Sequence, residues 1–209
     1  LVGSEMCIRD SLMARAAKQA GTPAIRTSSI RDVIAIKEET GLPVIGLVKI
    51  QYPGYEGYIT PTMKEVDDLV AAGSDVVALD CTLRKRGDGI TVNEFIAQIK
   101  EKYPDIILMA DISNYEEGIN AWKCGVDIVG TTMSGYTDYT SKKDEPDYEL
   151  MERLAKDTDI PIIGEGKIHY PDQAVKALQT GVWAIVVGGA ITRPLEIAQR
   201  FQKAIEAGK

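Results

Sequence analysis

Pro43-Val44-Ile45-Gly46-Leu47-Val48-Lys49 is the stretch on which the fold assignment depends. Its apolar residues follow one another without polar alternation, which predicts a strand buried on both faces of a parallel sheet. The run ends on Lys49, whose ammonium group is costly to bury without a partner. We therefore expect this strand to lead directly to a functional group.

The same unit of helix and apolar strand recurs along the chain. Most of the expected strands are apolar until a last residue that can take part in chemistry. The expected strands end at Arg26, Lys49, Asp80, Asp111, Thr131, Glu165 and Gly188, and the expected helices span 12–20, 30–39, 63–72, 92–102, 115–123, 147–156, 171–178 and 194–207. Seven strands preceded by a helix predict an α/β fold, a TIM (β/α)₈ barrel that lacks its first strand.

A doubly wound open sheet is the competing architecture. The strand ends favour the barrel, because there they converge on one rim, where barrel enzymes place their active sites. In an open sheet the same groups would be spread along an edge. We therefore interpret the strand-end residues as one constellation.

The first residues do not have the pattern of a folded segment. Glu5-Met6-Cys7-Ile8-Arg9-Asp10-Ser11 resembles the read-through of a transposon-derived sequencing adapter joined to an open reading frame cut at its 5′ end. An unusual natural N-terminal arm is the alternative. We expect residues 1–11 to be a non-native segment and residues 12–209 to form a single barrel domain.

Composition restricts the classes of function. The chain has 209 residues, 44% of them hydrophobic, and a formal net charge of −7. No apolar run reaches the ~20 residues of a membrane span, and the negative charge argues against a nucleic-acid partner. Three widely spaced cysteines and the single His169 offer no zinc-binding pattern and suggest a reducing, cytoplasmic setting. A metal site would therefore have to consist of oxygen ligands alone.

The segment after the last strand has the pattern of a phosphate site. It reads Gly188-Gly189-Ala190-Ile191-Thr192-Arg193-Pro194. Paired glycines let backbone N–H groups approach an anion, the next helix adds its positive end, and Arg193 can donate a charge-assisted hydrogen bond. Gly166, in the loop before, supplies the second half of such a site. A tight turn is the alternative explanation for Gly188 and Gly189.

Lys49 and Glu165 are the candidate catalytic residues. Lys49 could be a Schiff-base nucleophile, a proton carrier or an exposed surface lysine, and the residues alone do not decide between these roles. If Glu165 is its neighbour, the two groups share the proton-transfer work. Arg26 is better suited to bind an anion or a hydroxyl than to lie in a core. Asp111 could bind substrate or serve only as a cap.

The chain contains an ordered set of motifs. They are Ala24-Ile25-Arg26, Gly41 to Lys49 with Tyr52-Pro53, Ala78-Leu79-Asp80-Cys81-Thr82, Met109-Ala110-Asp111-Ile112, Val129-Gly130-Thr131-Thr132 with Gly135-Tyr136-Thr137, Glu165-Gly166, and Val187 to Pro194. From about Leu12 to the C-terminus, this set resembles the N-acetylmannosamine-6-phosphate 2-epimerase family. Each motif also occurs in other phosphate-binding barrels, whereas the whole ordered set is specific.

The resemblance implies interconversion of N-acetylmannosamine 6-phosphate and N-acetylglucosamine 6-phosphate, in sialic acid catabolism, by moving the proton on C2. It implies no cofactor, no metal and a phosphorylated amino sugar as the partner. A homodimer is compatible with the outer helices. By the family's pattern Lys49 and Glu165 are catalytic and Arg26 and Asp111 contact the sugar. The same pattern assigns the phosphate to Gly166, Gly188, Gly189 and Arg193.

Three departures from the family are visible. The family's substrate-binding glutamine near the end of the first strand is absent here, where the adapter-like segment stands. Ile50 and Gln51 follow the lysine, where a second basic residue is common, and Gly164 replaces a frequent alanine. The alternatives to the epimerase are therefore a non-catalytic truncated barrel fragment and a Schiff-base aldolase that acts on a phosphosugar.

Overall fold

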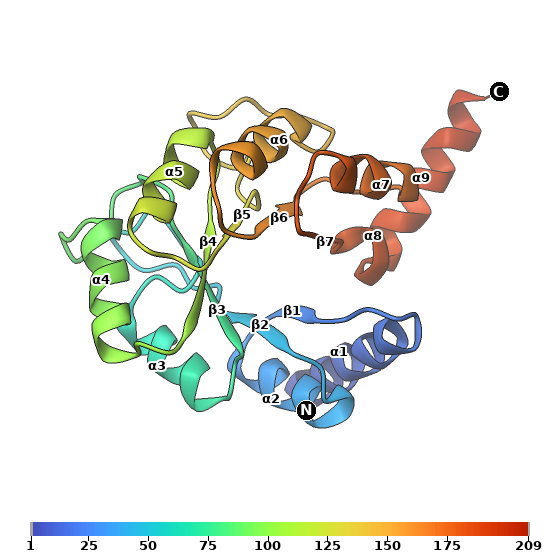
Figure 1. Cartoon of the computed structure of the whole chain (residues 1–209). Helices are drawn as coiled ribbons and strands as arrows, with labels where there is room; N and C mark the ends of the chain where they lie inside the picture. The colour runs from blue at the N-terminus through green and yellow to red at the C-terminus, as the bar shows by residue number, and fades with distance from the viewer. Residues whose placement is uncertain (1, 209) are drawn as a thin grey trace.

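The structure, a computed structural model, describes the backbone of residues 2–208 and the side chains of residues 11–208. Within them seven parallel strands follow one another in the sheet in the order of the chain, and helices surround them in a nearly closed barrel (Figure 1). A doubly wound sheet would reverse its strand order at a switch point, and this sheet does not. The expected (β/α)₈-type barrel with seven strands is confirmed.

The strands are β1 Ile25–Ser28, β2 Val44–Leu47, β3 Val76–Asp80, β4 Ile107–Asp111, β5 Ile128–Gly130, β6 Ile162–Glu165 and β7 Ala184–Val186. The helices are α1 Val2–Gln19, α2 Ile30–Thr40, α3 Met63–Ala71, α4 Val92–Lys102, α5 Tyr115–Lys123, α6 Tyr148–Asp157, α7 Pro171–Gln179, α8 Gly189–Thr192 and α9 Pro194–Ala207. Among the described residues, β1 pairs only with β2 and β7 only with β6, so each is paired on one edge.

Several expected boundaries were wrong. The first helix begins at Val2 and not at residue 12, and β2, β5 and β7 end at Leu47, Gly130 and Val186, before the expected Lys49, Thr131 and Gly188. Arg26 does not end its strand: β1 continues to Ser28, because Thr27 and Ser28 still pair with β2. The short helix α8 was also not expected, and it begins directly after Gly188, within the segment predicted to bind phosphate. The side chains of residues 1–10, which carry most of the adapter-like segment, lie outside the described residues.

Local sequence signals fix the helix ends. The Ser29 side chain accepts a hydrogen bond from Asp32 N at the start of α2, and Gly41 ends that helix in the left-handed conformation with φ 64°. Asn114 and Asp147 cap α5 and α6 in the same way as Ser29 caps α2. These caps set where each helix leaves the rim, and therefore the length of the loops there.

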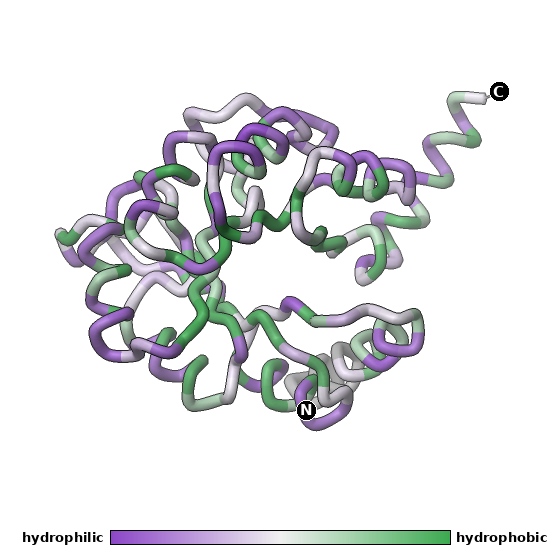
Figure 2. The backbone as a smooth tube through the Cα atoms, viewed as in Figure 1, coloured by the Kyte–Doolittle hydropathy of each residue, from purple (hydrophilic) through white to green (hydrophobic). Residues whose placement is uncertain are grey.

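Apolar side chains form two layers, one on each face of the sheet. Ile45 and Leu47 point into the barrel with Met109, whereas Val44 packs outward against the helices. Figure 2 shows the apolar residues concentrated along the strands and polar residues along the outer helices. Gly46 is required by close packing, because a Cβ there would clash with Ser74 Oγ. The expected strand buried on both faces is confirmed.

The C-terminal helix α9 lies apart from this core. It contributes no buried side chain and extends away from the body of the molecule (Figure 1). Leu195 and Phe201 on this helix are 71% and 69% exposed. No helix in the described part of the chain is long and apolar enough to cross a membrane.

Candidate active site

The barrel mouth contains a buried cluster of three charged side chains. Arg26 Nη2 donates to Asp111 Oδ2 at 2.7 Å, and Arg26 Nε lies 3.3 Å from Glu165 Oε2. The side chains of Arg26 and Asp111 are 7% and 0% exposed, whereas Glu165 keeps 18% of its side chain exposed. The structure therefore brings together three predicted site residues from β1, β4 and β6, and Glu165 is the member most open to the mouth.

The cluster shifts the protonation of its members. Burial raises the pKa of Glu165, and the Arg26 charge opposes that rise only in part. Burial alone would lower the pKa of Arg26, but the Asp111 and Glu165 carboxylates outweigh it and raise that pKa. Arg26 is therefore a fixed cation, and Glu165 is a carboxyl group that holds a proton more readily than one in water.

Two threonines at the end of β5 hold Glu165 in place. Thr131 Oγ1 donates to the Glu165 carbonyl oxygen at 2.8 Å and accepts from Glu165 N at 3.0 Å. Thr132 Oγ1 lies 2.7 Å from Asp111 Oδ1 and 3.1 Å from Glu165 Oε2. Sequence reasoning marked these threonines as strand-end residues but assigned them no role, because hydroxyl groups carry no distinctive charge or spacing.

Lys49 lies beyond β2 and is positioned by the segment 58–60. An isolated antiparallel bridge joins Lys49 to Ile59. Thr60 Oγ1 accepts from Val48 N at 3.2 Å and donates to the Ala78 carbonyl at 2.6 Å. Thr60 has φ 46°, a left-handed conformation that non-glycine residues rarely adopt. Such strain is typical of functional sites, and here it lies beside the predicted catalytic lysine.

The Lys49 side chain has no fixed partner. Lys49 is exposed, and its ammonium group makes no hydrogen bond or ion pair with any side chain that the structure describes. Its charge nevertheless reaches the buried cluster, where it lowers the pKa of Glu165. A cation without a side-chain partner, close enough for its charge to act on a buried carboxyl group, is available to act on a bound substrate.

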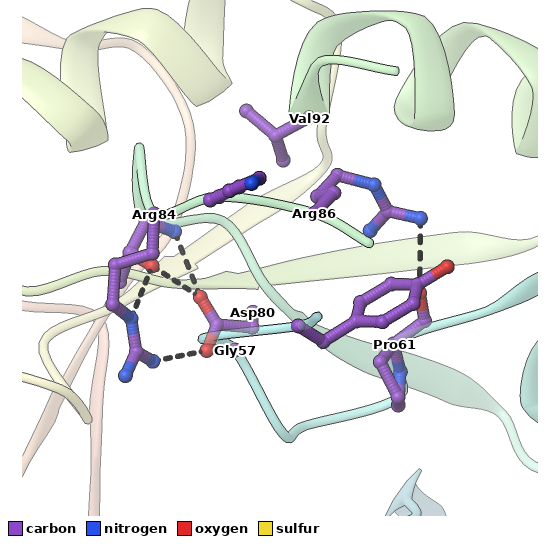
Figure 3. Close-up of a pocket in the computed structure, with 9 residues that line it drawn as sticks. Gly57, Pro61, Asp80, Arg84, Arg86 and Val92 are labelled. Atoms are coloured by element: carbon purple, nitrogen blue, oxygen red, sulfur yellow. Dashed lines mark hydrogen bonds and ion pairs between the residues drawn. The ribbon is translucent and has the colours of Figure 1, made fainter. Parts of the chain in front are cut away.

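Asp80, the strand-end acid of β3, has a structural role. It accepts hydrogen bonds from Thr82 and forms an ion pair with Arg84, so both of its oxygens are occupied (Figure 3). Asp80 also lines a neighbouring cavity together with Gly57, Arg86 and six further residues. The volume of this cavity is ≈ 10 Å³. That volume suits about one water molecule, so this cavity cannot hold a sugar phosphate.

The predicted phosphate residues lie at the ends of β6 and β7. Gly166 has φ 106°, and a Cβ at Gly188 would meet nothing within 4 Å. Arg193 is 64% exposed and forms an ion pair with Glu196 at 2.8 Å, folded over Gly189. Arg193 therefore does not touch the buried cluster, and the Glu196 carboxylate competes with an anion for its guanidinium group.

A buried acid that sequence reasoning missed ties the rim loops together. Glu117, at the start of α5, is fully buried. Its carboxylate accepts hydrogen bonds from Leu83 N, from Ser113 N and Oγ, and from the Tyr139 hydroxyl. Glu117 thereby fixes three loops of the mouth, including the loop after β5. Within the described side chains, no group of three His, Cys, Asp or Glu residues is placed to hold a metal ion.

Comparison with known proteins gives one consistent family. The family described as "Putative N-acetylmannosamine-6-phosphate epimerase" matches residues 10–207. Two relatives are named "Putative N-acetylmannosamine-6-phosphate 2-epimerase". The protein from Caldanaerobacter subterraneus is 56% identical over 90% of this chain and 80% of its own length. The protein from Clostridioides difficile is 50% identical over 93% of this chain and 86% of its own length.

Solved structures agree with these sequence matches. The N-acetylmannosamine-6-phosphate 2-epimerase from Clostridium perfringens superimposes with a TM-score of 0.88 at 48% identity, over 93% of this chain and 84% of that one. A thiamine phosphate pyrophosphorylase from Pyrococcus furiosus gives a TM-score of 0.57 at 20% identity, over 90% of this chain and 80% of that one. That second likeness shows the barrel fold alone.

Proposed function

This chain belongs to the N-acetylmannosamine-6-phosphate epimerase family, and from that membership we propose that it is an isomerase. It interconverts N-acetylmannosamine 6-phosphate and N-acetylglucosamine 6-phosphate by moving the proton on C2. The observation that carries the proposal is the buried cluster of Arg26, Asp111 and Glu165, whose carboxyl group also feels the charge of the unpaired Lys49 ammonium. This set supplies a proton acceptor, a proton donor and fixed positive charge at one place.

The chemistry requires these groups because C2 lies next to the aldehyde of the open-chain sugar. Removal of its proton gives an enolate, which positive charge and hydrogen-bond donors stabilise. Inversion requires that the proton leaves one face of C2 and returns to the other, so two groups must act in turn as base and acid. Glu165 and Lys49 take these two roles and exchange them in the reverse direction.

The sheet order supports this division of work. Lys49 follows β2 and Glu165 ends β6, four strands further along a sequential sheet. In a nearly closed barrel, strands four positions apart lie on opposite walls. The two side chains therefore approach a substrate in the mouth from opposite sides, as inversion at one carbon demands.

The direct test is proton exchange in heavy water. The chain is incubated with N-acetylglucosamine 6-phosphate in D₂O, and the C2–H signal is followed by proton NMR. We expect deuterium to enter at C2 and the second epimer to appear. The same experiment with unphosphorylated N-acetylglucosamine is the control and should run far more slowly. Absence of both deuterium entry and a second epimer would reject the epimerase.

We expect the ionisation of Glu165 to control the fall of kcat/KM at low pH. Since the carboxyl group must be ionised to accept the C2 proton, kcat/KM falls as the pH drops through the pKa of Glu165. Burial raises that pKa, so we expect the fall to lie above the ~4.3 of an ordinary glutamate. Glu165→Gln should remove this limb and lower kcat about 10³-fold. An acid limb at the ordinary glutamate value would contradict the prediction.

We expect Arg193 to contribute to binding of the phosphorylated sugar but not to the thermal stability of the fold. Arg193→Ala should raise the KM for the phosphorylated sugar about tenfold, because a charge-assisted hydrogen bond to phosphate is lost. Exposed ion pairs contribute little, so the melting temperature should change by no more than a degree or two. Glu196→Gln, which frees Arg193 from its surface partner, is the matched variant and should lower the KM. An unchanged KM in both variants would place the phosphate elsewhere.

A further inference from the structure

Thr132 lies directly between the two carboxylates of the buried cluster. Its Oγ1 is 2.7 Å from Asp111 Oδ1 and 3.1 Å from Glu165 Oε2. A threonine hydroxyl carries one proton, so it can donate to only one of these carboxylates at a time. Both contacts are favourable together only when one carboxyl group carries a proton and donates it to Thr132.

The geometry identifies which carboxyl group that is. Asp111 is fully buried, has the shorter contact to Thr132 and already accepts from Arg26 at 2.7 Å, so it is the natural final acceptor. Glu165 has the longer contact and is the member of the pair that faces the mouth. A continuous chain of hydrogen bonds therefore runs from a protonated Glu165 through Thr132 to the Asp111 carboxylate.

We propose that Thr132 is a positioning residue whose hydroxyl accepts a hydrogen bond from protonated Glu165 and donates its own to Asp111, holding the proton taken from C2. The inference rests on the proposed function, because the substrate supplies that proton. The C2–H bond breaks, an O–H bond forms on Glu165, and Thr132 neither gains nor loses a proton. Lys49 protonates the other face of C2, Glu165 then loses its proton to water, and the hydroxyl is free to turn towards either carboxylate.

The relay from Glu165 through Thr132 to Asp111 changes the pKa of Glu165 in the opposite direction to a hydroxyl that only donates to Glu165. A hydroxyl that only donated to Glu165 would lower the pKa of that residue. The relay gives protonated Glu165 two linked hydrogen bonds and the ionised form one, so it raises the pKa. The other charges that face Glu165 are Arg26 from β1 and Lys49 after β2, which lower the pKa, and Asp111 from β4, which raises it.

Thr132→Val removes the hydroxyl and keeps the shape of the side chain. We expect the pKa of Glu165 to fall in this variant, as measured by carbon-13 NMR titration of glutamate-labelled protein, with the signal assigned through Glu165→Gln. We expect kcat to fall about tenfold and KM to stay within about twofold. Thr132→Ser keeps the hydroxyl. It should restore the pKa of Glu165 and bring kcat to within about threefold of the kcat of the original chain.

The matched control is Thr158→Val, whose hydroxyl bonds only to the Leu154 carbonyl away from the mouth. It should leave the pKa of Glu165 and kcat unchanged. A higher or an unchanged Glu165 pKa in Thr132→Val would overturn the relay, and Thr132→Ala repeats the test if the valine variant does not fold. The titration needs no turnover, so failure of the unaltered chain to exchange C2 deuterium rejects the proposed function separately.

Discussion

Lys49→Met is expected to lower kcat for C2 epimerisation about 10³-fold with little change in thermal stability. Methionine keeps an unbranched side chain and removes the ammonium group that donates the proton and faces the enolate. Lys49 is exposed and makes no ion pair among the described side chains, so its loss breaks no contact that holds the fold. Deuterium entry at C2 measures the rate, and calorimetry measures the melting temperature.

A second exposed lysine serves as the control, because it shows whether loss of a positive charge anywhere on the surface lowers kcat. Lys64 on α3 is exposed and pairs only with Asp68, and Lys64→Met should keep kcat within about twofold. If Lys49→Met keeps more than a tenth of the activity, Lys49 is not the proton carrier. Borohydride reduction in the presence of substrate tests the aldolase alternative, because an imine on Lys49 would leave a stable adduct.

The sequence alone predicted the barrel because its signals are local and repeated. Buried parallel strands appear as apolar runs such as Val44–Leu47, and glycines such as Gly41 mark the helix ends. The strand ends Asp111 and Glu165 followed from the same pattern, and the structure places them in one cluster. Their catalytic and binding roles remain predictions, which the variants above test.

Features that depend on pairing between distant segments were not visible in the sequence. The register of β1 on β2 decides that Arg26 lies within its strand and that its side chain reaches Asp111 across the barrel. The left-handed conformation of Thr60 depends on the bridge between Lys49 and Ile59. A propensity or a motif carries no information about such contacts, because each one is set by a partner many residues away.

Arg26→Met is expected to destabilise the fold by about 3–5 kcal/mol at neutral pH, the typical effect of leaving buried charges without their partner. Arg26 is the only cation in ion-pair contact with both Asp111 and Glu165 among the described side chains. Methionine fills much of the same volume, so the loss comes from the uncompensated carboxylates. Urea unfolding measures it, and Arg193→Met, on the exposed surface, is the control and should change stability by less than about 1 kcal/mol.

The pH dependence of this loss identifies its cause. Arg26 lowers the pKa of Glu165, so in Arg26→Met that pKa rises further above its unfolded value. A carboxyl group whose folded pKa is raised adds stability below its unfolded pKa and loses it as the pH rises through the folded pKa. The difference between Arg26→Met and the original chain should therefore shrink as the pH falls towards about 4.3. A difference independent of pH would indicate lost packing instead.

A double-mutant cycle then separates charge from packing at the same position. Asp111→Asn removes the negative charge that Arg26 neutralises while keeping a similar shape. If buried charge causes the loss, Arg26→Met combined with Asp111→Asn should be more stable than the sum of the two single losses predicts, by about 1–3 kcal/mol. Additive losses would mean that the two side chains act independently in the fold. In that case the cluster would not be the electrostatic unit on which both the raised pKa of Glu165 and the proposed proton transfer depend.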